Sequence, residues 1–377
     1  MHPTRRARRL RAGLAALVTV TAAGLLTAGS ALAAPAGHGG TSFIGPLHHT
    51  RVVASTIPKN GDVNPYGVAV VPRSAGDLRR GDVLVSNFNN STNTQGTGST
   101  IVEVTPGGHQ SLFAHVTDGN CPGGVGLTTA LVVLRSGWVI VGSLPTQSSV
   151  TTNGGISGPG CLIVLDKWGH VRNTITQGID GPWDMTSVDL GGFTELFVTN
   201  VLGGILGPAN PNGGTVERLL INSGYTHVPH VLASTQIGSG FPARTDPNAL
   251  VIGPTGVGVS RNGTAYVADT LSNRIAAIPN AVFRHHDDGT GATVTQGGWL
   301  VGPLGLAIAP NGNILTVNGG NGSMVETTPF GKQIVKKTVD HNQGGAGNLF
   351  GLAVKPGADA VYFVDDFMND NNLQLLF

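Results

Sequence analysis

Polar side chains recur at equivalent positions of a repeated pattern in this sequence, each at the end of a short apolar run. They stand at Asn87, Ser143, Asn200, Asp269, Asn318 and Asp365. A further carboxylate, Asp184, occupies a position where the other copies of the pattern have small residues. Carboxylate and amide oxygens are the ligands that Ca²⁺ and Mg²⁺ prefer. We therefore predict a ligand-binding set of Asp184, Asn87, Asn200, Asp269, Asn318 and Asp365, in which Asp184, Asp269 and Asp365 are the candidate metal ligands.

A structural role accounts for most of the same pattern. Asn and Asp terminate strands and begin turns in many repeats, and the position is polar in every copy, as a structural rule would require. Asp184 falls outside that rule. The residues aligned with it are Gly67, Ala130, Gly256, Gly305 and Gly351.

The elements that must position these residues form a repeat. In its plainest copy, an apolar strand over 303–308 leads through Pro310-Asn311-Gly312 to a second strand over 314–318. The alternation of large and small residues is typical of a strand, and Asn-Gly is typical of a tight hairpin turn. Third and fourth strands follow in most copies, as over 100–104 and 110–113. Repeated units of four strands indicate propeller blades.

The number of strands also predicts how the ring closes. Six copies can be aligned, and the sixth ends after its third strand, over 373–377. An unpaired strand over 50–55 can supply the missing fourth, which removes two exposed sheet edges. We predict an all-β, six-bladed β-propeller over 50–377, with four-stranded antiparallel blades and the last blade closed by the N-terminal strand.

This fold would place the candidate residues around one opening. Inner strands line the channel of a propeller, so their starts and the ends of the second strands meet at the same face, here called the top face. We expect the small residues there to leave the opening free and Asp184 to project toward it. The loops over 88–99, 144–160 and 201–214 are long and emerge on this face. They are either a binding surface or tolerated insertions.

The N-terminus indicates export. Five arginines between Arg5 and Arg11 precede an apolar stretch over 14–26, and Ala31-Leu32-Ala33 offers a cleavage site. We predict a signal peptide over 1–33, a flexible leader over 34–49 and secretion by the general route. An exported chain with two cysteines is expected to form a disulfide, and Cys121 and Cys161 both fall on the top face of the second blade.

The charge balance and the apolar segments of the chain limit the kinds of binding partner that we expect. The chain has 22 Lys and Arg against 21 Asp and Glu, and without the five leader arginines the balance is 17 against 21, a net charge of −4. This argues against nucleic acid as a partner. No later segment is long and apolar enough to span a membrane. We expect a monomer that binds an extracellular ligand, glycan or protein.

The repeat resembles the NHL type, most closely from Gly256 to Asp269 and on through Thr270-Leu271-Ser272-Asn273-Arg274-Ile275. The segment from Val83 to Val104 is similar to secreted bacterial NHL-repeat proteins of unassigned function. The resemblance covers the mature chain. It implies a propeller distantly similar to streptogramin lyases and gluconolactonases, and it is specific for the fold but not for function.

Two functions remain open. The first is a non-catalytic binding module that acts through the top face. The second is a lyase or lactonase that uses a divalent cation at the mouth of the channel. The histidines, among them His227, His230, His285 and His286, do not fit the three-histidine zinc pattern of amidating-lyase propellers, and the lactonase metal set requires a Glu among its ligands. Because no His or Glu acid/base is expected at the mouth, we favour the binding module.

Overall fold

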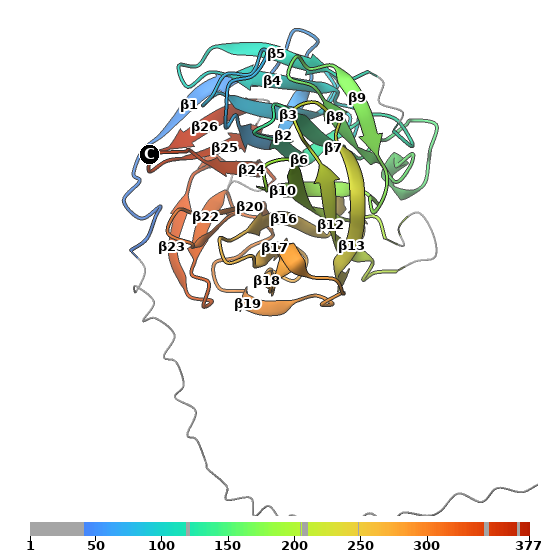
Figure 1. The fold of residues 1–377 in the computed structure, drawn as a ribbon. Coiled ribbons are helices and arrows are strands. Elements are labelled where there is room, and N and C mark those ends of the chain that lie inside the picture. The colour runs from blue at the N-terminus through green and yellow to red at the C-terminus, as the bar shows by residue number, and fades with distance from the viewer. Residues whose placement is uncertain are drawn as a thin grey trace, which may run out of the picture. The chain divides into compact units, whose positions relative to one another are not determined.

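Within the described residues, six four-stranded antiparallel sheets surround a central channel in the computed structural model (Figure 1). The structure describes residues 41–377 except 118–120, 204, 206–209, 248, 343–346 and 368–369. The predicted signal peptide and residues 34–40 of the predicted leader lie outside this range.

The first three blades follow one another along the chain. Blade one comprises β2 (Val63–Val70), β3 (Val83–Asn89), β4 (Thr100–Val104) and β5 (Gln110–His115). Blade two comprises β6 (Leu127–Val133), β7 (Val139–Ser143), β8 (Cys161–Leu165) and β9 (Val171–Ile175). Blade three comprises β10 (Pro182–Asp189), β11 (Phe193–Asn200), β12 (Gly214–Asn222) and β13 (His230–Phe241).

The remaining blades complete the ring. Blade four comprises β16 (Pro254–Val259), β17 (Ala265–Asp269), β18 (Arg274–Ile278) and β19 (Ala292–Gln296). Blade five comprises β20 (Pro303–Ile308), β21 (Ile314–Asn318), β22 (Ser323–Thr327) and β23 (Gln333–Thr338). Blade six comprises β24 (Leu349–Val354), β25 (Val361–Asp365), β26 (Asn372–Leu376) and the N-terminal strand β1 (Thr50–Ser55).

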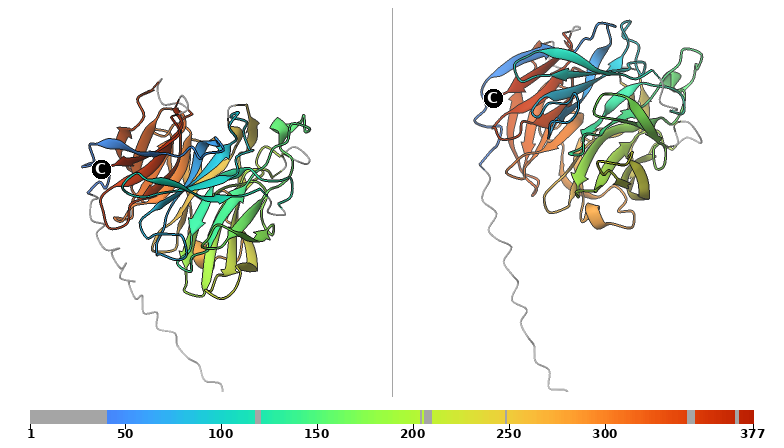
Figure 2. Two further views of the ribbon diagram at one scale, coloured as in Figure 1. Left: turned by 90° about the horizontal axis from the view of Figure 1, so that it is seen from above. Right: turned by 45° about the horizontal axis from the view of Figure 1, so that its top comes forward.

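The predicted closure of the ring is confirmed. β1 pairs antiparallel with β26, from Thr50 opposite Leu376 to Ser55 opposite Asn372. Figure 2 shows β1, in blue, beside the red C-terminal strands in two further views. The pairing covers an edge of β26 that would otherwise expose unpaired backbone groups.

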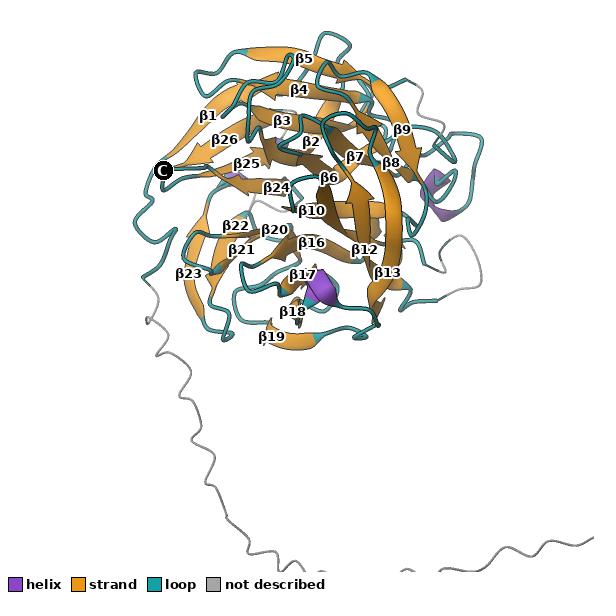
Figure 3. Ribbon diagram, viewed as in Figure 1, coloured by secondary structure: helices purple, strands orange, loops and turns teal. Residues whose placement is uncertain are grey.

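Two features of the secondary structure were not predicted. A short hairpin of β14 (Arg244–Asp246) and β15 (Leu250–Ile252) lies between blades three and four in the sequence. Two short 3₁₀ helices, η1 (Asn153–Gly155) and η2 (Ala281–Phe283), also lie between strands (Figure 3). No helix in the described part of the chain has the length and apolar character needed to cross a bilayer.

The segment ahead of β1 is packed, which corrects the expectation of a flexible leader for residues 42–47. Phe43, Ile44 and Leu47 are buried in a cluster with residues of blades five and six. The carboxylate of Glu326, itself fully buried, accepts hydrogen bonds from the backbone N–H groups of Phe43 (2.8 Å) and Ile44 (2.9 Å). A buried carboxylate needs such donors. The segment that supplies them is thereby fixed to blade five.

Every inner strand carries an irregularity near its start. Its pairing with the second strand shifts register at Pro65/Gly67, Leu127/Leu131, Pro182/Met185, Pro254/Val257, Pro303/Leu306 and Leu349/Leu352. A bulge interrupts the alternation of side chains and redirects the residues within it. The channel wall near the top face is therefore built from bulge residues, Asp184 among them.

Candidate functional site

The small residues at the bulges allow neighbouring blades to approach closely. A Cβ added to Gly305 would lie 2.2 Å from the carbonyl oxygen of Phe350 in the next blade, and one added to Gly351 would lie 2.2 Å from that of Tyr66. The same holds for Gly256, whose added Cβ would lie 2.3 Å from the carbonyl oxygen of Leu304. The glycines thus serve contact between blades. The expectation that they keep the mouth open is wrong.

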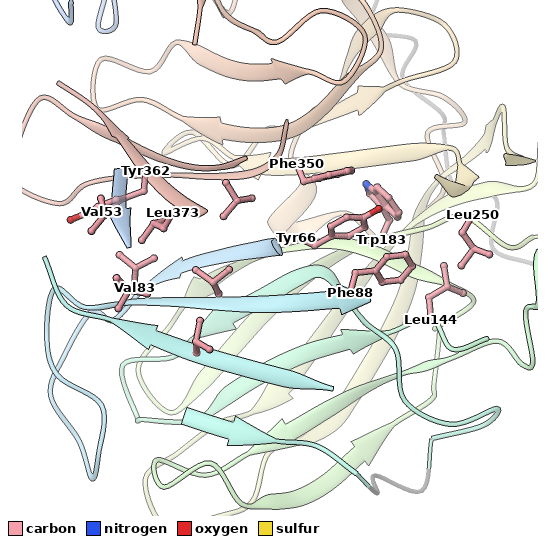
Figure 4. Packing of buried hydrophobic residues seen from close by; sticks show 14 of the residues in the cluster. Val53, Tyr66, Val83, Phe88, Leu144, Trp183, Leu250, Phe350, Tyr362 and Leu373 are labelled. Carbon is pink, nitrogen blue, oxygen red and sulfur yellow. The ribbon is translucent and has the colours of Figure 1, made fainter. Parts of the chain in front are cut away.

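Aromatic side chains fill the top of the channel instead. Tyr66 stacks on Phe350 at 4.0 Å and on Phe88 at 4.5 Å between ring centroids, and meets the edge of Trp183 at 5.4 Å (Figure 4). These residues come from blades one, three and six, so the contact crosses the channel. We call them the aromatic plug.

The plug is closed off from solvent. Tyr66 and Trp183 are each 1% exposed, and Phe88 is fully buried. They share an apolar cluster with Leu144 and Leu250, which follow β7 and begin β15. Sequence reasoning missed the plug, although Tyr66, Trp183 and Phe350 occupy one repeat position, directly before Gly67, Asp184 and Gly351.

The asparagines at the ends of the second strands hold the connections that enter each blade. Asn87 donates from Nδ2 to the carbonyl of Thr56 (3.0 Å), Asn200 to that of Gly178 (2.9 Å), and Asn318 to that of Trp299 (2.8 Å). Each acceptor lies in the segment that leads into the blade. An amide suits this position because it satisfies a buried carbonyl that no strand partner reaches.

The two aspartates at this position also have protein partners. Asp269 pairs with the guanidinium of Arg274, whose Nε and Nη2 lie 3.0 and 2.9 Å from Oδ2. Asp365 accepts from the N–H of Phe367 and from Nε2 of Gln374, both at 3.0 Å. Burial raises the pKa of Asp365 to about 6. A ligand-binding role for this ring remains a prediction.

The three candidate metal ligands are not gathered into one group. Among the described residues, no set of three or more His, Cys, Asp or Glu side chains is placed to hold a metal ion. Asp184, Asp269 and Asp365 belong to blades three, four and six, and their carboxylates bond to different partners. A Ca²⁺ or Mg²⁺ site among these aspartates therefore stays a prediction, and no cluster of ligands in the described residues supports it.

Asp184 differs from the other five because it lines the channel. Its Oδ1 accepts from the N–H of Met185 at 2.8 Å, and its Oδ2 accepts from the N–H of Val257 in blade four at 3.1 Å. Burial raises the pKa of Asp184 to about 7, and the two amide donors only partly offset that rise. Its carboxyl group therefore joins two blades and changes charge near neutral pH.

Below the plug the channel holds a cavity of about 320 Å³. Residues of all six inner strands line it, mostly Val, Leu, Ile and Ala, with the polar groups Thr129, Asp184, Thr186 and Ser187 on blades two and three. Exposure rises along the strands: Asp184 is 8% exposed, whereas Thr186 and Ser187 are half-buried. The cavity therefore lies toward the face where the inner strands end, here called the lower face.

The predicted disulfide between Cys121 and Cys161 is confirmed, with 5.5 Å between the Cα atoms. It ties the segment entering blade two to the first residue of β8. Hydrogen bonds extend this link: Nε2 of Gln147 and Oγ of Ser157 donate to the carbonyl of Gly123 at 2.9 and 2.8 Å. The long loop of blade two is therefore fixed at both ends.

That loop and the loop after β3 enclose a hollow of about 610 Å³, here called the top-face hollow. The N–H of Thr146 donates to the carbonyl of Gly96 at 2.9 Å and so joins the two loops. Uncharged residues line it: Asn90, Thr94, Gln95, Thr97, Thr146, Gln147, Ser148, Val150, Thr151, Gly154 and Gly155. Amide and hydroxyl groups can donate and accept hydrogen bonds here, but none is a general acid or base of ordinary strength.

Solved structures show the same fold at low identity. A calcium-binding regucalcin from Agrobacterium tumefaciens is 13% identical, with 85% of this chain and 92% of that chain covered and a TM-score of 0.55. A gluconolactonase from Xanthomonas campestris is 12% identical over 87% and 89%, with a TM-score of 0.54. A catalytically inactive virginiamycin B lyase from Staphylococcus aureus, solved with quinupristin, is 11% identical over 87% and 100%, with a TM-score of 0.50.

These likenesses establish the propeller fold and the distant resemblance to lactonase and lyase propellers. No protein-family model matches the chain, and no curated protein matches its sequence. The NHL assignment therefore stays a prediction. Identities this low say nothing of activity.

Proposed function

We propose that this chain is an exported, non-catalytic binding module that acts through its top face. The observation that carries the proposal is the top-face hollow, which is rigidly braced and lined by uncharged hydrogen-bonding groups. Loops on a rigid scaffold commonly carry binding function. The aromatic plug supports binding by the top-face loops, because it closes the channel and a ligand at the top face therefore contacts the loops.

The lining favours a neutral, hydroxyl-rich ligand such as an uncharged glycan. Protein interfaces take most of their binding energy from Trp, Tyr and Arg side chains, and none of these lines the hollow. A charged ligand would find no countercharge among the lining residues. Amides and hydroxyls, by contrast, match the mixed donors and acceptors of sugar hydroxyl groups.

The alternative, a metal-dependent lyase or lactonase, has only the fold in its favour. The regucalcin and the gluconolactonase are only 13% and 12% identical to this chain in sequence. We expect millimolar Ca²⁺ and Mg²⁺ to leave the melting midpoint of the protein unchanged. Bound metal would raise the melting midpoint by mass action. If the midpoint rises and Asp184→Asn abolishes that rise, the metal site is established instead.

The binding proposal is tested with immobilised neutral oligosaccharides, such as cellohexaose, maltohexaose and chitotetraose, presented to the purified mature protein. Ser148→Arg places a bulky side chain at an exposed position in the hollow and should abolish binding. Ala358→Arg adds the same group to an exposed turn between β24 and β25, on the lower face, and is the matched control. Absence of binding to every neutral glycan, or binding that Ser148→Arg leaves intact, would overturn the proposal.

A further inference from the structure

A second cleft lies on the lower face, between blades two and three, and aromatic side chains form it. Trp138, Trp168 and Tyr225 contribute to its lining, and its volume is about 460 Å³. We call it the aromatic cleft. The whole chain has four Trp and four Tyr residues, so three of these eight side chains gather at one place. They come from the β6–β7, β8–β9 and β12–β13 turns.

Two of the rings are open to solvent. Trp168 is 48% exposed and Tyr225 is 63% exposed, whereas Tyr66, Trp183 and Tyr362 are each 1% exposed. Large apolar side chains exposed together mark binding sites more often than isolated ones do. Trp138 is half-buried, and its Nε1 donates to the carbonyl of Gly224 at 3.3 Å, which holds the turn that carries Tyr225.

Cationic groups accompany the rings. Nζ of Lys167 lies 4.5 Å from the ring centroid of Trp168. The guanidinium carbon of Arg73 lies 5.6 Å from the ring centroid of Tyr225, and its Nη1 donates to the Tyr225 hydroxyl at 2.8 Å. These contacts orient the rings through cation–π attraction and leave positive charge at the rim.

The one acidic residue in the lining is neutralised within the protein. Asp166 pairs with Nη2 of Arg172 at 2.6 Å, and its Oδ1 accepts from the N–H groups of Trp168 (2.9 Å) and His170 (3.0 Å). Burial favours the neutral acid, but these hydrogen bonds outweigh it and lower the pKa of Asp166. Asp166 therefore fixes the turn that presents Trp168. With Asp166 and Arg172 paired, Lys167 in the lining and Arg73 beside Tyr225 remain as the net positive charge that a ligand meets.

We propose that the aromatic cleft binds a saccharide chain that carries carboxylate groups. A sugar ring has an apolar C–H face that packs flat on Trp or Tyr, and ring carboxylates pair with Lys and Arg. The cleft volume lies within the usual range for ligand sites, roughly 300–1,000 Å³. A proline-rich peptide could also stack on these rings. The excess of positive charge favours the acidic saccharide.

This site is separate from the top-face hollow in place and in chemistry. The hollow is made by top-face loops and its lining is uncharged, whereas the cleft is made by lower-face turns and its rim is cationic. Neutral glycans therefore test the first, and acidic glycans test the second. Either proposal can fail while the other stands.

The experiment titrates the mature protein with an alginate hexasaccharide and, separately, with neutral cellohexaose and a polyproline decapeptide, by calorimetry at low ionic strength. We expect the uronate to bind and to weaken as salt is raised, because exposed ion pairs are screened. Trp168→Ala should reduce affinity about tenfold or more, as for a central aromatic anchor. Lys167→Ala should reduce affinity for the uronate and flatten its salt dependence.

Matched controls separate local from general effects. Trp299→Ala removes a tryptophan that is 42% exposed but lies before blade five, and Lys336→Ala removes an exposed lysine of β23. Both should bind as the wild type does. The proposal is overturned if the uronate does not bind, if Trp168→Ala binds it normally in a protein with an unchanged melting midpoint, or if only the polyproline peptide binds.

Discussion

Substitution of Asp184 by Asn should remove a pH-dependent contribution to stability whose size can be calculated from the structure. Burial raises the pKa of this carboxyl group from 3.8 to about 7 in the folded state. Because the folded state binds the proton more tightly, this group contributes stability below pH 3.8 that is lost as pH rises through 7. Each pKa unit corresponds to about 1.4 kcal/mol, so the loss is about 4 kcal/mol.

The Asn variant cannot ionise at this position, but it has a cost of its own. Asp184 Oδ2 accepts a hydrogen bond from the N–H of Val257 at 3.1 Å, and the side-chain NH₂ group of Asn cannot accept that bond. Leaving that buried donor unpaired costs about 1–3 kcal/mol at every pH. We therefore expect the variant to be less stable than the wild type at pH 4 and as stable or more stable at pH 8.

Urea denaturation of both proteins at pH 4, 5.5 and 8 measures this difference. Other carboxyl groups with a raised pKa, such as that of Asp366, are present in both proteins. Comparing the two proteins therefore removes their contribution. Asp359→Asn, in the exposed turn between β24 and β25, shows how much of any change follows from net charge. A difference in unfolding free energy that is the same at pH 4 and pH 8 would refute the reasoning.

Three further variants, one of them with a matched control, test the packing that supports the two faces. Replacing both Cys121 and Cys161 by Ser should lower stability by about 4 kcal/mol, the value expected for a closed loop of 40 residues, measured by urea denaturation. Gly305→Ala should cost about 1–3 kcal/mol by forcing blade six away, whereas Gly192→Ala, with open space around it, should be neutral in thermal melts. Glu326→Gln should cost about 1–3 kcal/mol at neutral pH and expose residues 42–47 to protease. Hydrogen bonds outweigh burial and lower the pKa of Glu326, so this cost should shrink as pH falls through that lowered value.

The fold and its closure were predictable because they depend on features that repeat. The strand period, the turns and the unpaired strand at Thr50–Ser55 each limit the topology, and together they fix the number of blades. The disulfide was predictable for a related reason, since the repeat placed both cysteines at one end of one blade. Local pattern and topology agree at all of these positions.

The interior of the channel was not predictable, because the bulges break the alternation on which such inference depends. A strand pattern says which side chains share a face only while the register is regular. At Trp183 and Asp184 the register shifts, so the sequence placed Asp184 toward the opening but could not show that Trp183 also lies in the channel, or at what depth. The aromatic cleft was hidden for another reason: Trp168 and Tyr225 meet across two blades, and no local pattern links them.

The departures from the regular repeat concentrate in one half of the ring, and this explains how one scaffold can offer two binding surfaces. The braced loops, the disulfide, Asp184 and the aromatic cleft all belong to blades one to three. In blades four to six the connections between second and third strands are short, apart from the segment 366–371 in blade six. A rigid ring needs its inner strands and blade contacts to be preserved, but the loops and turns at either face can change without disturbing the core. Because the plug separates the top-face loops from the cavity beneath it, changes at one face need not disturb the other. The sites proposed on the top and lower faces are therefore expected to bind independently, so that Ser148→Arg should leave uronate binding intact and Trp168→Ala should leave neutral-glycan binding intact.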